Sequence, residues 1–246
     1  MGSIIAIDMG NSTIKGTALL GSEVCGEVRV GLDAVDELVN WCGGMDAQGA
    51  IVSSVSADAQ PVVTALQACC PHVMELTAAT PLPITVGYRN PQQLGADRVA
   101  AAVGAWALLR GHDTLVVDAG SAVTLDLLTA EGHLMGGNIS AGVAMRLRAL
   151  HDYTQRLPQV SPQGPVPIVG QDTEGAMRAG AVRGVVAEIE AMCARLASMG
   201  VNVEVVLTGG DAPLLLPHMA IKPHHREHLV AEGLNEIFRR AEEEVF

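Results

Sequence analysis

Short apolar runs that end in polar and glycine residues alternate along this chain with longer segments of helical character. The first run, Ile4–Ile7, ends at Asp8 and is followed by strand-like segments over 13–20 and 23–30. Short β-branched runs bounded by turn residues are typical of strands, and Gly21-Ser22 fits the turn between the last two. The pattern therefore predicts an opening set of three strands, with the turn Met9-Gly10-Asn11-Ser12 after the first.

The rest of the chain predicts alternating strands and helices. We expect strands near 50–55 and 203–207, and helices near 34–42, 97–109, 143–155 and 173–198. The last helix carries Gly180 and Gly184, where we expect a kink or close packing, and Gly200 closes it. Residues 77–83 and 161–167 read as proline-containing connections. Buried strands that alternate with helices indicate an α/β fold.

A second copy of the opening arrangement begins about 110 residues later. The apolar run 115–117 ends at Asp118, and Ala119-Gly120-Ser121 precedes a strand near 122–128 and a return that ends at Gly136-Gly137. This recurrence predicts two duplicated domains, residues 1–112 and 113–246. Two strands that end in Asp-x-Gly by coincidence are the alternative, and the motif alone leaves both open.

Composition sharpens this picture of the core and of the partners. Hydrophobic residues make up 49% of the chain, yet Phe, Trp and Tyr number two each, so we expect an aliphatic core. Acidic residues outnumber basic ones by 27 to 15, a formal charge of −12. Because non-specific nucleic-acid binding needs a positive face, this balance opposes it. An anionic substrate would have to be held by local groups.

The five cysteines contain no Cys-x-x-Cys pair, which opposes a disulfide framework or a zinc site. No stretch resembles a signal peptide or is long enough to span a membrane. We therefore expect a cytoplasmic protein with no membrane partner. His224 and His228 are spaced like helical metal ligands, but the segment has no helical pattern and lacks the glutamate of a zinc protease, so surface histidines are the favoured interpretation.

The first loop carries groups suited to phosphate. Asp8 could hold a metal ion through water, Gly10 would let backbone approach closely, and Lys15 supplies one positive charge. The chain has no Gly-Lys pair of a Walker A loop and no Gly-x-Gly-x-x-Gly. A turn chosen for its backbone dihedrals is the alternative interpretation of this loop.

Three further segments could carry chemistry. The loop from Asp118 to Ser121 could clamp a polyphosphate together with the first loop, and the glycines of Thr208-Gly209-Gly210 would let an adenine lie flat on the backbone. Residues 136–142 precede a helix whose first amides could face an anion. Asp97 fits a helix-capping or first-turn acid, or a general base beside Arg98.

Taken together, these motifs resemble the type III pantothenate kinases of the actin, hexokinase and heat-shock ATPase superfamily. The resemblance rests on Asp8–Ser12 with Lys15, on Tyr88–Pro91 with Gly95–Arg98, on Asp118–Ser121, on Thr173–Ala176, and on Thr208–Asp211 with Glu232–Leu234. It implies an α/β fold of two duplicated ribonuclease-H-like domains with ATP in the cleft between them. Ser12 and Ser121 stand where Thr is usual, and Ala141 where Pro is common.

The resemblance also implies an activity, the ATP-dependent phosphorylation of pantothenate in coenzyme A biosynthesis, with Mg²⁺ accompanying ATP. Asp97 would accept the proton, Asp118 would bind K⁺ or NH₄⁺, and the active unit would be a homodimer in which Thr173 contacts the neighbouring subunit's substrate. The implied ATP-binding residues are Asp8, Met9, Gly10, Asn11, Ser12, Thr13, Ile14, Lys15 and Ser121, and the implied pantothenate-binding residues are Tyr88, Gly95, Ala96, Asp97, Arg98 and Thr173. A kinase of another small alcohol and a non-catalytic regulator are the alternatives.

Overall fold

The computed structural model describes residues 2–55 and 58–245 and divides them into two compact units. The first unit contains residues up to 110, residues 132–134 and the segment from 228 onward. The second unit contains residues 111–131 and 135–227. The C-terminal helix therefore belongs to the first unit. The division into duplicated domains at residues 112 and 113 stays a prediction.

The first unit is built on a five-stranded sheet in the order β3-β2-β1-β4-β5. Strands β1, β2 and β3 are antiparallel, and β4 and β5 run parallel to β1. Gly21, with φ +64°, makes the tight turn between β2 and β3. The strands are β1 (Ser3–Met9), β2 (Thr13–Leu20), β3 (Glu23–Gly31), β4 (Ala47–Ser54) and β5 (His72–Glu75), joined by helices α1 (Val35–Gly43) and α2 (Gln60–Leu66).

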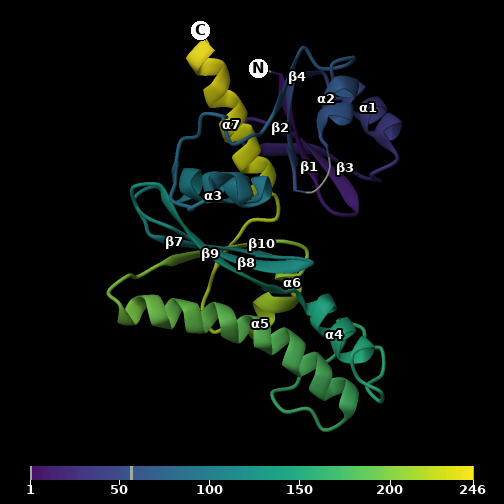
Figure 1. Cartoon of the computed structure of the whole chain (residues 1–246), viewed down its shortest axis with the longest axis vertical. Coiled ribbons are helices and arrows are strands. Elements are labelled where there is room, and N and C mark those ends of the chain that lie inside the picture. The colour runs from purple at the N-terminus through teal and green to yellow at the C-terminus, as the bar shows by residue number, and fades with distance from the viewer. Residues whose placement is uncertain (1, 56–57, 246) are drawn as a thin grey trace. The chain divides into compact units, whose positions relative to one another are not determined.

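Two helices of the first unit cross in backbone contact. Helix α3 (Ala96–Leu108) lies against α7 (Leu229–Val245), and Figure 1 shows the two side by side. A Cβ atom on Gly233 would collide with the carbonyl of Ala100, and one on Gly104 would lie 2.6 Å from the carbonyl oxygen of Leu229. Glycine is therefore needed on both helices for this approach, which fixes α3 against the unit.

The segment before α3 is anchored by a short bridge. Strand β6 (Thr85–Val86) pairs with His133 and Leu134, and the Thr85 hydroxyl lies 2.6 Å from His133 Nδ1. A single 3₁₀ turn, Pro91–Gln93, then leads into α3. This anchoring positions the loop that contains Tyr88.

The second unit repeats the strand order of the first. Five strands of its sheet run in the order β9-β8-β7-β10-β11, with β7 and β8 antiparallel and β10 parallel to both β7 and β11. The sixth strand of the sheet is β6, which pairs with the start of β9. This match agrees with the expected duplication. The elements are β7 (Thr114–Ala119), β8 (Ala122–Leu128), β9 (His133–Ala141), α4 (Val143–Asp152), α5 (Thr173–Ser198), β10 (Glu204–Thr208), α6 (Ala212–Leu215), a 3₁₀ turn (Leu216–His218) and β11 (His224–His225).

Helix α5 runs along one face of the second sheet (Figure 1) and supplies buried Val182, Val185 and Ile189 to its core. We expect a kink or close packing at Gly180 and Gly184, and the structure bears this out at one of the two. A Cβ on Gly184 would lie 3.0 Å from the Arg146 guanidinium, but one on Gly180 would meet open space. Of the two predicted positions, only Gly184 is closely packed, and the helix is continuous over its predicted range.

The cores of both units are aliphatic, as predicted. Every side chain among the largest fully buried ones is Ile or Leu, for example Ile7 in the first unit and Ile189 in the second. Several short elements differ from the expectation. The pattern misses α2 and β5, β9 continues beyond Gly137 to Ala141, and α4 ends at Asp152 rather than near 155.

Candidate functional site

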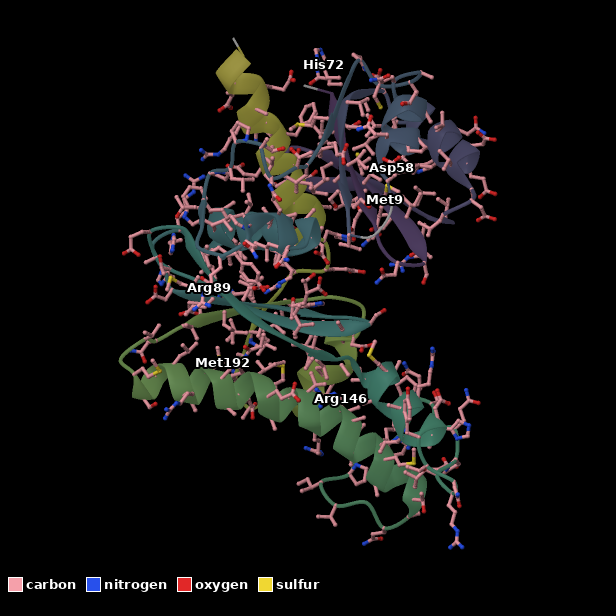
Figure 2. The ribbon with its side chains drawn as sticks, in the orientation of Figure 1. Met9, Asp58, His72, Arg89, Arg146 and Met192 are labelled. Carbon is pink, nitrogen blue, oxygen red and sulfur yellow. The ribbon has the colours of Figure 1, made fainter. Side chains whose placement is uncertain are left out.

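In the first unit, the predicted phosphate loop is the turn between β1 and β2. Asp8 lies opposite Lys15 in the antiparallel register, and the Gly10 amide donates to the Thr13 carbonyl at 3.0 Å. Asn11 and Ser12 are exposed at the tip. The label of Met9 in Figure 2 marks where β1 ends. The hairpin thus presents exposed polar groups beside one carboxylate and one ammonium group.

Asp8 is a partly buried carboxylate in an unfavourable setting. Burial raises its pKa to about 6, and the nearby charge of Asp97 acts in the same direction. A hydrogen bond from Ser53 and the charges of Lys15 and Arg29 oppose the rise. The Ser53 hydroxyl lies 3.3 Å from Asp8 Oδ1, next to Asp8 in the parallel register of β1 and β4. The charges of two carboxylates from distant parts of the chain, Asp8 and Asp97, therefore act on one another.

Asp97 occupies the first turn of α3. Gly95 is the N-cap residue, so Asp97 is a first-turn acid and not the cap. Its Oδ1 accepts from the backbone amide of Arg98 at 2.8 Å, and a Cβ on Gly95 would collide with that oxygen. A carboxylate at a helix N-terminus is stabilised by the helix dipole. The glycine therefore gives Asp97 the room to fold toward its own helix.

Arg98 and Tyr88 come together as the resemblance implied. The Arg98 side chain is buried at 6% exposure, and its guanidinium carbon lies 5.6 Å from the centre of the Tyr88 ring. Such a cation–π contact holds the loop of residues 86–90 against α3. The structure thus joins two predicted pantothenate-binding residues within the first unit.

A cavity of about 310 Å³ lies at the start of α3 in the first unit, although Tyr88, Asp97 and Arg98 are not among the residues that line it. This is the size of a small-molecule site. Gly95 and Ala96 line it, and so does Val99 from the next turn of α3. The other lining residues come from the end of β4, from the connection after β5, from β6 and from the 3₁₀ turn and the residue after it: Ser54, Val55, Leu76, Thr77, Ala78, Leu82, Val86, Pro91, Gln92, Gln93 and Leu94.

In the second unit, Gly209 packs against the start of the loop from Asp118 to Ser121. Asp118 lies at the end of β7, between Thr124 of β8 and Thr208 of β10. Gly209 has φ +93°, and a Cβ there would collide with the Asp118 carboxylate and the Ala119 carbonyl. The Thr-Gly-Gly turn is therefore packed directly against the carboxylate that we predicted to bind a cation.

The N-terminus of α4 also meets this loop. The Gly142 amide donates to the Ser121 carbonyl at 3.1 Å, and a Cβ on Gly142 would collide with the Gly120 carbonyl. Burial raises the pKa of Asp211, and its hydrogen bond with the Val143 amide opposes the rise. Residues 136–142 do precede a helix, as predicted: Gly142 is the N-cap of α4, and residues 136–141 belong to β9.

Thr173 is the first residue of α5, directly after the N-cap Asp172, whose carboxylate accepts from the Gly175 amide at 2.7 Å. It is exposed, as are apolar side chains nearby in the chain, with Tyr153 at 89% and Ile168 at 82%. A hollow of about 500 Å³ lies between α4 and α5, lined by Leu150, Tyr153 and Gly180 among others.

His224 and His228 do not lie on one helix, as the spacing of helical metal ligands would require. His224 belongs to β11 of the second unit, 3.2 Å from Glu204 Oε2, whereas His228 belongs to the first unit. Over residues 2–55 and 58–245, no cluster of three metal-ligating side chains is found, and no helix is long and apolar enough to cross a membrane.

Sequence reasoning missed three groups around this site. Ser53 lies in the strand predicted near 50–55, where the apolar pattern indicates only burial. A polar residue near the end of a buried strand could have indicated a site residue. Glu27, 3.0 Å from Lys15 Nζ, and the apolar wall formed by Leu76 and Val86 lie outside every motif. Their positions follow from sheet pairing and packing, which a local pattern does not encode.

Comparison with known proteins identifies the family. A family model described as type III pantothenate kinase matches residues 4–195. The chain belongs to the type III pantothenate kinases. The type III pantothenate kinase of Phocaeicola vulgatus is 38% identical over 95% of this chain and 96% of its own length. That of Hyphomonas neptunium is 31% identical over 96% of this chain and 99% of its own length. The resemblance, and the expected phosphotransferase class, are confirmed.

Solved structures confirm the fold of this pantothenate kinase. Component A of the Acidaminococcus fermentans (R)-2-hydroxyglutaryl-CoA dehydratase matches 98% of this chain and all of its own with a TM-score of 0.54 and 14% identity. A putative N-acetylmannosamine kinase from Listeria monocytogenes matches 98% of this chain and 99% of its own at 0.53 and 12% identity. At such identities the likeness concerns the fold alone, and it agrees with the predicted α/β fold.

Proposed function

We propose that this protein transfers the γ-phosphoryl group of ATP to the 4′-hydroxyl of pantothenate, with Asp97 as the general base. The observation that carries this proposal is that the charges of Asp8 and Asp97 act on one another, and that Asp97 directly follows Gly95 and Ala96, which line a small-molecule cavity. Phosphoryl transfer needs mainly positioning and charge neutralisation. A paired arrangement lets one carboxylate serve the cation and the other the acceptor hydroxyl.

The acceptor would lie in the cavity, where Leu76 and Val86 offer apolar surface. Arg98, two residues after the lining residue Ala96, would supply a positive charge for the carboxylate of pantothenate. Asp97 would then accept the proton of the hydroxyl as it attacks, since its position at the start of α3 borders the cavity residues Gly95 and Ala96. Tyr88 would hold Arg98 in place.

Asp8 fits the role of a magnesium-binding residue. Mg²⁺ in nucleotide sites is held by one or two carboxylates together with phosphate oxygens, and this chain offers that donor set. When bound, the ion would neutralise charge on the transferring phosphoryl group. The Gly10–Thr13 turn and Lys15 would hold the phosphates, and Ser53 would orient the Asp8 carboxylate.

The second unit would contribute Ser121 to phosphate binding and Asp118 to a monovalent cation, K⁺ or NH₄⁺. The support is chemical: a carboxylate is a suitable oxygen ligand for such an ion, and Gly209 lets the backbone pack against it. We further propose a homodimer, because exposed apolar side chains, Tyr153 and Ile168 among them, precede Thr173, the residue assigned to the neighbouring subunit's substrate. A cytoplasmic location stays a prediction.

Purified protein incubated with ATP, Mg²⁺, K⁺ and pantothenate tests this proposal. We expect stoichiometric ADP and 4′-phosphopantothenate, and an Asp97→Asn variant that binds both substrates but turns over on the order of a hundredfold more slowly. Turnover of a sugar or another small alcohol in preference to pantothenate would favour a different kinase. Nucleotide binding without turnover on any acceptor would favour a regulator.

A further inference from the structure

Lys15 does not stand alone beside the phosphate loop. Its ammonium nitrogen lies 3.0 Å from Glu27 Oε1 and 3.4 Å from His228 Nδ1. The same His228 nitrogen lies 3.1 Å from the same Glu27 oxygen. Side-chain exposure is 28% for Lys15 and 19% for His228, so both are largely shielded from water. An ammonium, a carboxylate and an imidazole of the first unit therefore form a closed triangle.

The nitrogen of His228 can serve only one partner at a time. If Nδ1 is unprotonated, it accepts a hydrogen bond from Lys15, and Glu27 depends on Lys15 for its donor. If Nδ1 carries a proton, it donates to Glu27, and the Lys15 ammonium is no longer needed there. Arg29, opposite Lys15 on β3, and Asp8, opposite Lys15 on β1, complete the charged surroundings. Two mutually exclusive patterns thus exist at one histidine atom.

We propose that Glu27 and His228 are positioning residues for Lys15, which they hold in the nucleotide-free protein, and that His228 becomes the donor to Glu27 when Lys15 turns to phosphate. This inference rests on the proposed function, in which Lys15 binds ATP. Without a donor at residue 228, the departure of Lys15 would leave the Glu27 carboxylate, whose side chain is 40% exposed, with water in place of a protein donor. Phosphate would then have to compete with a stronger hold on the ammonium. Nucleotide affinity is therefore set in part by the Glu27–His228 pair.

The magnesium–ATP dissociation constant, measured by titration calorimetry on the full chain, tests this exchange. We expect His228→Phe to raise the constant by about three- to tenfold, the effect of one partly exposed charged hydrogen bond. His228→Asn, whose amide can donate to Glu27, should restore most of the affinity. Glu27→Gln should bind at least as tightly as wild type, because a competing anion is gone. In that background His228→Phe should have no further effect.

Controls keep structural damage and failure of the proposed function apart. Glu23→Gln removes a charge from the same strand, at an exposed position, and should leave the constant unchanged. Thermal unfolding identifies any variant that is misfolded, and His228→Leu replaces His228→Phe in that case. Wild-type protein that binds no magnesium–ATP would refute the proposed function. If wild-type protein binds magnesium–ATP and His228→Phe raises the dissociation constant equally in the wild-type and Glu27→Gln backgrounds, the exchange is refuted. The proposed function would remain.

Discussion

Asp8→Asn should stabilise the ligand-free protein while it abolishes turnover. The Asp8 pKa in the folded protein is about 6 against an ordinary value of 3.8, so the folded state pays for ionising this group. Each pKa unit corresponds to about 1.4 kcal/mol, which gives about 3 kcal/mol at pH 7. Because Asp8 is only partly buried, solvent reduces this, and we expect about 2 kcal/mol.

The pH dependence gives the sign of this effect. An acid whose folded pKa is raised binds more protons in the folded state, so the free energy of unfolding falls as pH rises from about 4 to about 6. The wild type therefore loses stability over this window, and Asp8→Asn, which cannot ionise, does not. The advantage of the variant should be full above pH 7 and about half as large at pH 5.

Urea unfolding of both proteins at pH 5, 6, 7 and 8 measures this difference, with Glu23→Gln as the control for loss of an exposed charge. A magnesium–nucleotide complex should stabilise the wild type and leave Asp8→Asn unaffected, since the variant lacks the anionic ligand. The reasoning would be refuted if Asp8→Asn were less stable than wild type at pH 7. A gain in stability that stayed constant from pH 5 to pH 8 would refute it equally.

Three further perturbations address other parts of the molecule. Gly233→Ala should lower the free energy of unfolding by about 2 kcal/mol or more, because its Cβ would collide with Ala100 on α3. Gly43→Ala is the control in the same denaturation assay. A Cβ there would meet only ordinary contact distances, so this variant should be neutral or slightly stabilising. Turnover should rise when K⁺ or NH₄⁺ replaces a large organic cation, and Asp118→Asn should lose most of that rise; an unchanged response would remove Asp118 from the cation site. Tyr153→Glu should shift sedimentation toward monomer and lower turnover, while Met199→Glu, which alters another exposed apolar side chain at 68% exposure, should do neither.

Elements with a strong local signal could be predicted from the sequence. Helix α5 has its predicted bounds because Asp172 caps its start and Gly200, at φ +88°, ends it. Strands β2 and β8 coincide with predicted strand segments that contain β-branched residues and are bounded by turns. Helix α2 has seven residues with Pro61 near its start and no side-chain cap, so the pattern misses it. The pairing of α7 with α3 depends on Gly104 and Gly233, which only tertiary packing brings together.

The candidate site divides in the same way. Asp8, Asp97 and Asp118 stand in motifs at strand ends or at a helix start, where local chemistry suggests their roles. That the charges of Asp8 and Asp97 act on one another could not be read from positions so far apart in the chain. Ser53 and Glu27 belong to no motif, and His228 belongs to a histidine segment that favours surface histidines. All three reach the site through strand register and the path of the chain into α7.

The crossing of α3 and α7 imposes an order on biosynthesis. Residues 2–110 leave the ribosome more than a hundred residues before the helix that completes their unit, Leu229–Val245. Until then the glycine and alanine face of α3 has no partner, and Asp97 sits on an incompletely supported helix. A nascent chain can therefore complete the second unit before the first, and a premature stop codon ahead of Leu229 would leave the predicted base without its supporting helix.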